Sequence, residues 1–146
     1  RKLDAGHYDA ICLAAAGLRR LGLADRITQA FDLQDVLPAV GQGILALQTR
    51  ADDAAVRAAV APLHDLAAGL AARAERAALA TLGGGCRVPF GAYAEVHGDA
   101  VTVRAVLCSP DGHALLRAGG TGTDPEALGA GIARELWERG QSRFEA

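Results

Sequence analysis

Apolar residues in the first part of the chain fall into short runs separated by glycine, proline and charged residues. Residues 8–15 form a nearly continuous apolar run, which is typical of a strand covered on both faces of an α/β sheet. Residues 44–48 alternate well enough to predict a second strand. Asp52 or Asp53 then provides an N-cap for a helix that reaches about residue 64. This part of the chain therefore predicts α/β structure.

The next segment has the period of an amphipathic helix. It is expected to run from about residue 65 to the glycines at positions 83–85, where the backbone can leave the helix. Apolar positions three and four apart predict the buried face, which carries Leu66, Leu70, Ala74, Ala77 and Ala78. The opposite face is predicted to hold Arg73, Glu75 and Arg76.

The last third of the chain changes to a strand pattern and then returns to a helix. Residues 88–96, 100–107 and 113–118 predict three antiparallel strands, because they are strand-like runs separated by short turns that contain glycine and aspartate. A final helix is expected to begin after Asp124, which caps it ahead of a proline, and to stop at Gly140. The order helix, three strands, helix predicts a small α+β domain able to bury its own core.

Composition and charge narrow the classes of protein that fit. The chain has 146 residues, 51% of them hydrophobic, with 15 basic and 17 acidic residues. This balance gives no field that would favour nucleic acid or an anionic membrane as a partner. The longest uncharged apolar stretch, residues 10–18, is too short to cross a bilayer, and the first residues lack a signal-peptide pattern. We therefore expect a cytoplasmic protein.

The three cysteines, Cys12, Cys86 and Cys108, are spaced neither as metal ligands nor as a disulfide framework, so no metal site is expected. Cys12 and Cys108 lie inside predicted strands and are interpreted as core residues. Cys86 differs, because it follows three glycines and precedes Arg87, which would favour a reactive thiolate. The same residues also fit a helix cap beside a small buried cysteine. The residues alone leave both interpretations open.

Three parts of the chain resemble a known family in the same order. They are residues 8–11 with 16–22 (AGLRRLG), residues 37–43 (LPAVGQG), and residues 74–94, which include the loop GGCRVPFG. On these motifs the chain is similar to the C-terminal half of the porphobilinogen deaminases, also called hydroxymethylbilane synthases. This resemblance implies a transferase of tetrapyrrole and haem biosynthesis. Such enzymes join four porphobilinogen molecules, with loss of ammonia, into hydroxymethylbilane.

The resemblance also implies a covalent cofactor. The family holds dipyrromethane by a thioether to the cysteine of this glycine-rich loop, which here is Cys86. A soft sulfur nucleophile suits the electrophilic azafulvene that forms when porphobilinogen loses ammonia. Cys86 would anchor the primer and would not turn over in each cycle.

Further binding roles follow from the same motifs. Arg20 matches the family arginine that binds the acetate and propionate groups of the pyrroles, which a guanidinium holds bidentately. Arg19 is interpreted as a surface charge, because the family accepts lysine there. Gly17 would let backbone amides approach the cofactor. Gln42 and Gly43 would lie beside the active cleft, where the family chain crosses between domains, and a plain hinge loop is the alternative interpretation.

The family architecture implies three domains, of which the first two are discontinuous and resemble periplasmic binding proteins. Residues 1–38 would end the second domain, residues 39–62 would return to the first, and residues 63–146 would form the cofactor-bearing C-terminal domain. The catalytic aspartate would lie in an absent N-terminal half, so no catalytic residue is expected here and the chain alone should be inactive. Expected partners are porphobilinogen and that half, in a monomeric enzyme. Residues 1–62 should be unstable or oligomerise, because their strands lack sheet partners.

Two other classes of function stay open. Residues 65–146 could form a non-catalytic interaction module in which the glycines only cap a helix. A different thiol enzyme could use Cys86 as a redox or acyl nucleophile, although no resolving cysteine or convincing histidine base lies nearby in the sequence. A pyrrole adduct that depends on Cys86 would separate the first interpretation from both alternatives.

Overall fold

The computed structural model describes residues 1–83 and 89–144, the last four of them as backbone only. The chain divides into two compact units, Arg1–Val36 and Leu37–Ala146. No helix of the described residues is long and apolar enough to cross a membrane.

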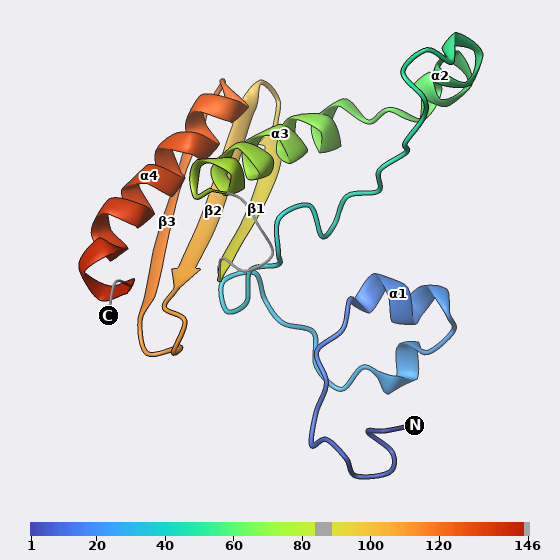
Figure 1. Cartoon of the computed structure of the whole chain (residues 1–146). Coiled ribbons are helices and arrows are strands. Elements are labelled where there is room, and N and C mark those ends of the chain that lie inside the picture. Colours follow the sequence, from blue (N-terminus) through green and yellow to red (C-terminus); the bar gives the residue numbers. More distant parts are fainter. Residues whose placement is uncertain (84–88, 145–146) are drawn as a thin grey trace. The chain divides into compact units, whose positions relative to one another are not determined.

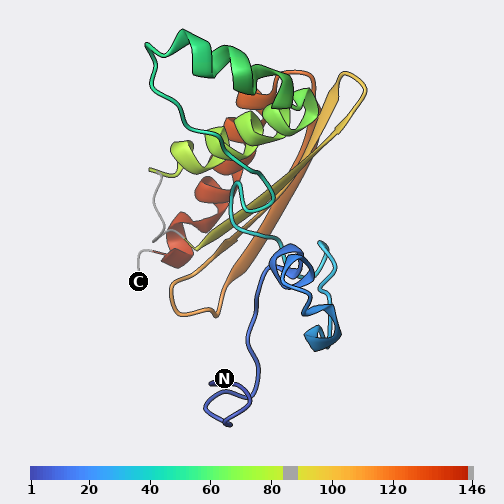
Figure 2. The ribbon, with the colours of Figure 1, turned by 90° about the vertical axis from the view of Figure 1, so that its right-hand side faces the viewer.

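The second unit contains a three-stranded antiparallel sheet in the order β1-β2-β3. Its strands are β1 (Phe90–His97), β2 (Ala100–Cys108) and β3 (Leu115–Gly122). The helices α3 (Leu66–Thr81) and α4 (Pro125–Phe144) pack together on one face of this sheet (Figures 1 and 2). The small α+β domain predicted from the sequence, helix, three strands, helix, is therefore confirmed.

The strand boundaries differ from the expected ones mainly in β3. This strand was expected at residues 113–118 but runs from Leu115 to Gly122, where Gly119 pairs with Arg104 and Gly120 pairs with Val103. Glycine has a low strand propensity, yet the ladder hydrogen bonds to β2 decide the conformation here. Position 88, the expected start of the first strand, lies outside the described residues.

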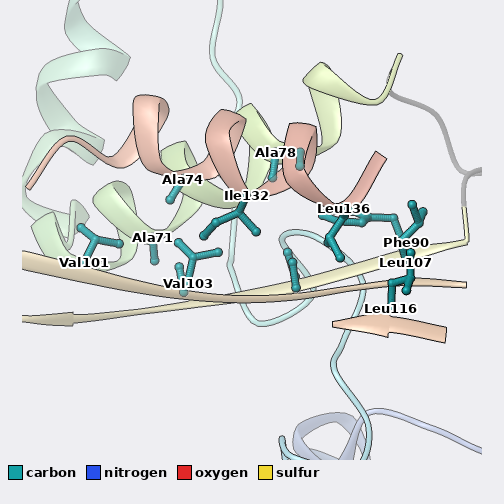
Figure 3. Packing of buried hydrophobic residues seen from close by; sticks show 14 residues of the cluster. Ala71, Ala74, Ala78, Phe90, Val101, Val103, Leu107, Leu116, Ile132 and Leu136 are labelled. Atoms are coloured by element: carbon teal, nitrogen blue, oxygen red, sulfur yellow. The ribbon is translucent and has the colours of Figure 1, made fainter. Parts of the chain in front are cut away.

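The core lies between the helices and the sheet (Figure 3). Strand β2 sends alternate side chains into it, and Val101 and Val103 are almost completely buried. From α4, Ile132 lies over Val103, and Leu136 lies farther along the sheet near Phe90 and Leu107. The face of α3 in the core is made of small residues, namely Ala71, Ala74 and Ala78. Small residues allow α3 to lie close to both the sheet and α4.

The buried face of α3 is rotated from the predicted one. Leu66 is 69% exposed, whereas Glu75, which was expected on the charged face, is 4% exposed. The period of 3.6 identifies a stripe that faces the sheet. The same period does not reveal that residues 37–44 also cover part of α3. The contact with these residues is what buries Glu75.

The prediction that Gly140 stops the last helix is wrong, because α4 continues to Phe144. Gly140 is buried and lies inside this helix. A glycine inside a helix costs about 1 kcal/mol relative to alanine. This cost is smaller than the stabilisation that a fully buried residue such as Leu136 provides.

The first unit contains only a short helix, α1 (Ala15–Arg20), and a 3₁₀ turn, η1 (Ala24–Arg26). The strand expected at residues 8–15 does not form, and Cys12 is exposed and not in a core. A strand needs a neighbour to pair its N–H and C=O groups, and residues 1–36 supply none.

The helix α1 ends in a glycine cap. Gly22 has a φ of 71°, the Leu23 N–H donates to the Leu18 carbonyl at 2.8 Å, and the Gly22 N–H donates to that of Arg19 at 3.1 Å. This is the Schellman arrangement, which favours glycine at the left-handed position. The last glycine of the AGLRRLG motif therefore has a local structural role.

Residues 44–48, expected as a strand, also remain unpaired, and Leu45 is 89% exposed. The following helix is confirmed as α2 (Ala54–Val60), continued by the 3₁₀ turn η2 (Ala61–Leu63). Of the two predicted caps, Asp52 and Asp53, the structure uses Asp53, whose carboxylate accepts the Val56 N–H at 3.0 Å.

Candidate functional site

The candidate cofactor thiol, Cys86, and its neighbour Arg87 lie outside the described residues. The described chain leaves α3 through Gly83, which has a φ of 79°, and returns to the sheet at Pro89. The Pro89 carbonyl accepts the Cys108 N–H at 2.9 Å, which fixes this return point to the end of β2. Cys108 itself is half-buried, so it lies at the margin of the core.

Residues 37–44 pack along the free edge of β1, as Figure 1 shows. Ala92, on that edge, donates its N–H to the Pro38 carbonyl at 3.2 Å. A Cβ added at Gly91 would lie 3.0 Å from the Pro38 carbonyl oxygen and 3.2 Å from that of Leu37. Gly91 is thus required for this close approach, and the loop covers backbone groups that a strand edge would otherwise expose.

A tight turn holds the tip of this loop. The Gln42 N–H donates to the Ala39 carbonyl, and the Ile44 N–H donates to the Gly41 carbonyl, both at 3.0 Å. Gly41 has a φ of 73°, a conformation that favours glycine, and its own N–H donates to Oε2 of Glu75 at 2.7 Å. The turn leaves Gln42 and Gly43 exposed to solvent.

Gln42 and Gly43 share a small cleft of about 170 Å³ with Glu75 and Tyr93. Two of the predicted binding residues, Gln42 and Gly43, therefore lie beside Glu75 and Tyr93, for which the sequence predicted no binding role. A side-chain amide, a phenol and backbone amides can all form hydrogen bonds with a polar ligand. The cofactor-binding role of Gln42 and Gly43 stays a prediction.

The other two predicted binding residues, Gly17 and Arg20, lie three positions apart on α1 in the first unit. Arg20 is exposed, and no atom lies within 4 Å of the position that a Cβ at Gly17 would take. Arg19 is exposed as well. The helix therefore offers two accessible guanidinium groups in its last turn.

An ion pair joins α3 to the start of α4. Nη2 of Arg73 donates to Oε2 of Glu126 at 2.8 Å, and Nε of the same arginine donates to Oε1. This hydrogen bonding raises the pKa of Arg73 and lowers that of Glu126. Both side chains are about half exposed. The pair is therefore interpreted as a surface contact between α3 and α4 and not as part of a buried binding site.

No group of His, Cys, Asp and Glu residues suited to a metal ion occurs among residues 1–83 and 89–144. Among the residues that line the cleft, the sequence interpretation misplaced Glu75, which it expected on the charged face of α3. Its position in the sequence could have indicated burial. Glu75 directly follows Ala74 and lies three residues before Ala78, and both alanines belong to the small-residue face of the helix.

Two family models match this chain in succession. Residues 1–58 match "Porphobilinogen deaminase, dipyromethane cofactor binding domain", and residues 69–138 match "Porphobilinogen deaminase, C-terminal domain". The protein class is thus one in which a cofactor-binding domain is followed by a separate C-terminal domain. The second match covers most of the α+β domain described above.

Curated relatives agree with these matches. A porphobilinogen deaminase of Acidithiobacillus ferrooxidans is 47% identical over 144 residues, which are 99% of this chain and 47% of the relative. One from Exiguobacterium is 48% identical over 141 residues, and one from Roseiflexus is 47% identical over 142. The chain belongs to the porphobilinogen deaminase family, as its motifs indicated. It spans about half the length of the curated relatives it matches.

Proposed function

We propose that this chain is the C-terminal half of a transferase that joins four porphobilinogen molecules into hydroxymethylbilane. The observation that carries the proposal is the succession of two domain matches, at residues 1–58 and 69–138, with the GGC motif inside the second. A family cofactor domain and a cysteine in the expected loop together favour a catalytic assembly over the alternative of a non-catalytic interaction module.

In this proposal Cys86 anchors the dipyrromethane cofactor. The thiolate sulfur attacks the exocyclic carbon of an azafulvene, a C–S bond forms, and the electron pair returns to the pyrrole nitrogen, which takes up a proton. The azafulvene arises when the aminomethyl C–N bond of porphobilinogen breaks and the amine leaves, after protonation, as ammonia. When bound, dipyrromethane would supply the free pyrrole α-carbon to which the first porphobilinogen unit is joined. Sulfur is suited to the first step because it is soft and readily polarised.

The exposed helix α1 supports a carboxylate-binding role for Arg20. Each pyrrole unit carries an acetate and a propionate, and a guanidinium forms two parallel hydrogen bonds with a carboxylate. Gly17, one turn earlier, leaves open space beside the backbone where a planar ring could approach. Gln42 and Gly43 are proposed to contact the cofactor or a growing chain from the second unit.

The complete enzyme is proposed to need the N-terminal half that the relatives possess, including the acid that protonates the leaving amine. Exposed apolar side chains support this. In the first unit they include Tyr8, Ile11 and Leu13, and in the second Leu45 and Leu47. We propose that residues 1–38 and 39–62 belong to two domains that resemble periplasmic binding proteins. The unpaired segments 8–15 and 44–48 would then find strand partners in the N-terminal half. We further propose a cytoplasmic, monomeric complete enzyme.

Co-expression tests this function. The chain is produced together with the N-terminal half of the Acidithiobacillus ferrooxidans relative, and intact mass spectrometry measures adducts on the chain. We expect an added mass of two pyrrole units that Cys86→Ser abolishes and Cys12→Ser does not. Product formation from porphobilinogen should appear in the complex and not in the chain alone. A folded complex without any adduct would support the interaction module instead.

A further inference from the structure

The carboxylate of Glu75 joins two segments that are distant in the sequence. It projects from α3 and is 4% exposed. Oε1 accepts the Ala94 N–H at 2.9 Å, and Oε2 accepts the Gly41 N–H at 2.7 Å. The first donor belongs to the free edge of β1 and the second to the turn at residues 41–43, so one side chain sets the spacing between strand and turn.

This arrangement is costly unless both hydrogen bonds form. Burial of a carboxylate is unfavourable because the group loses its hydration, and charge-assisted hydrogen bonds have to replace it. Among residues 1–83 and 89–140, no lysine, arginine or histidine forms an ion pair with Glu75. Two backbone amides therefore supply the compensation, and the pairing is directional because each oxygen has its own donor.

A neutral amide cannot replace this group. Glutamine keeps one acceptor oxygen but presents an NH₂ in place of the second, and that NH₂ would face the N–H of either Gly41 or Ala94. Two donors facing each other leave a buried N–H unsatisfied. Aspartate keeps both oxygens but is one methylene shorter, so it cannot reach both amides from the same backbone position.

We propose that Glu75 is a positioning residue, which holds the turn at residues 41–43 against β1 and thereby presents Gln42 and Gly43 at the cleft beside Tyr93. Contacts at two places hold the same loop against β1: the Glu75 carboxylate at Gly41, and the Pro38 carbonyl, which accepts the Ala92 N–H and lies close to Gly91. The part of this inference that concerns the reaction rests on the proposed function. The part that concerns the loop does not.

Hydrogen exchange of single amides in the whole chain tests the loop contact. In the unsubstituted protein the Gly41 and Ala94 amides should be protected, although neither has a backbone acceptor. In Glu75→Gln the protection of either Gly41 or Ala94, whichever faces the side-chain NH₂, should fall by about 10-fold or more, while that of Val103 in β2 should stay within a factor of two. Glu138→Gln, the same change at an exposed position of α4, is the control.

Two results would overturn the loop contact. One is a Gly41 amide that exchanges freely in the unsubstituted protein, a measurement that does not depend on any variant folding. The other is equal loss of protection at Gly41, Ala94 and Val103 in Glu75→Gln, since general destabilisation and not positioning would produce it. Glu75→Asp keeps the charge but shortens the side chain by one methylene. We expect it to lose Gly41 protection as well, because the shorter carboxylate cannot reach both amides.

The co-expressed complex tests the consequence for the reaction. With Glu75→Gln we expect the pyrrole adduct on Cys86 to persist while kcat for hydroxymethylbilane formation falls by about 10-fold, because misplaced contacts cost rate. Glu138→Gln should retain kcat. Absence of the adduct in the unsubstituted complex would refute the proposed function and leave the exchange result intact. An adduct with unchanged kcat in Glu75→Gln would refute the positioning role alone.

Discussion

Gly129 of α4 lies directly against the Ala74 carbonyl of α3, so closely that a Cβ at Gly129 would be 2.0 Å from the carbonyl oxygen. Backbone thus meets backbone where the two helices cross. The neighbouring glycine on α4, Gly131, has no atom within 4 Å of its corresponding position. These two glycines therefore have opposite structural requirements, although both occupy the interior of the same helix.

The two glycines give a matched pair for stability measurements. Gly129→Ala should lower the free energy of unfolding by about 3 kcal/mol or more, because the clash is with backbone and the helices have to separate. Gly131→Ala should be neutral or stabilise by up to about 1 kcal/mol, since alanine has the higher helix propensity. Urea unfolding of both variants measures the difference. Equal destabilisation by the two substitutions would contradict the close crossing.

Truncation of Leu136 tests the core between α4 and the sheet. Leu136 has no exposed surface, and its replacement by alanine should lower the free energy of unfolding by about 2–5 kcal/mol through lost burial and a cavity. Leu115→Ala, at a leucine that is 53% exposed, should stay within about 0.5 kcal/mol of the unsubstituted protein. Chemical denaturation compares the two. A small effect at Leu136 would mean that α4 does not pack as described.

The Arg73–Glu126 pair predicts a pH dependence of stability. Hydrogen bonding to Arg73 lowers the pKa of Glu126 below its ordinary value of 4.5. Because the folded-state pKa is the lower one, the stabilisation is complete above that ordinary value and is lost as the pH falls through the folded-state pKa. Unfolding curves between pH 6 and pH 2 should show less acid-dependent loss in Glu126→Gln. Glu138→Gln is the control, and added salt should weaken the effect, since the pair is exposed.

Arg20 and Arg19 offer a matched pair for function in the co-expressed complex. Arg20→Lys should raise the KM for porphobilinogen or lower kcat by about 10-fold, because lysine cannot form the bidentate contact with a carboxylate. Arg19→Lys should leave both constants unchanged, because this arginine is predicted to be a surface charge. Steady-state kinetics decides the matter. An effect of equal size at both positions would indicate general electrostatic attraction.

The sequence predicted the C-terminal domain more accurately than the first 63 residues for a physical reason. The domain from α3 to α4 contains its own hydrogen-bond partners, so period and turn residues sufficed to locate three strands and two helices. Residues 8–15 and 44–48 carry strand patterns without a neighbour to pair with. Local pattern expresses a tendency to form a strand, and only pairing realises it.

The sequence by itself determined the family, the order of elements in the α+β domain, and an aspartate cap for α2 at Asp52 or Asp53. These depend on contacts between residues a few positions apart. Only the tertiary structure decided that Glu75 is buried and that Gly129 lies directly against the Ala74 carbonyl at a helix crossing. Both depend on backbone groups that packing brings close together. Glu75 and Gly41, for example, are 34 positions apart in the sequence. A one-dimensional pattern of polarity carries no record of such contacts.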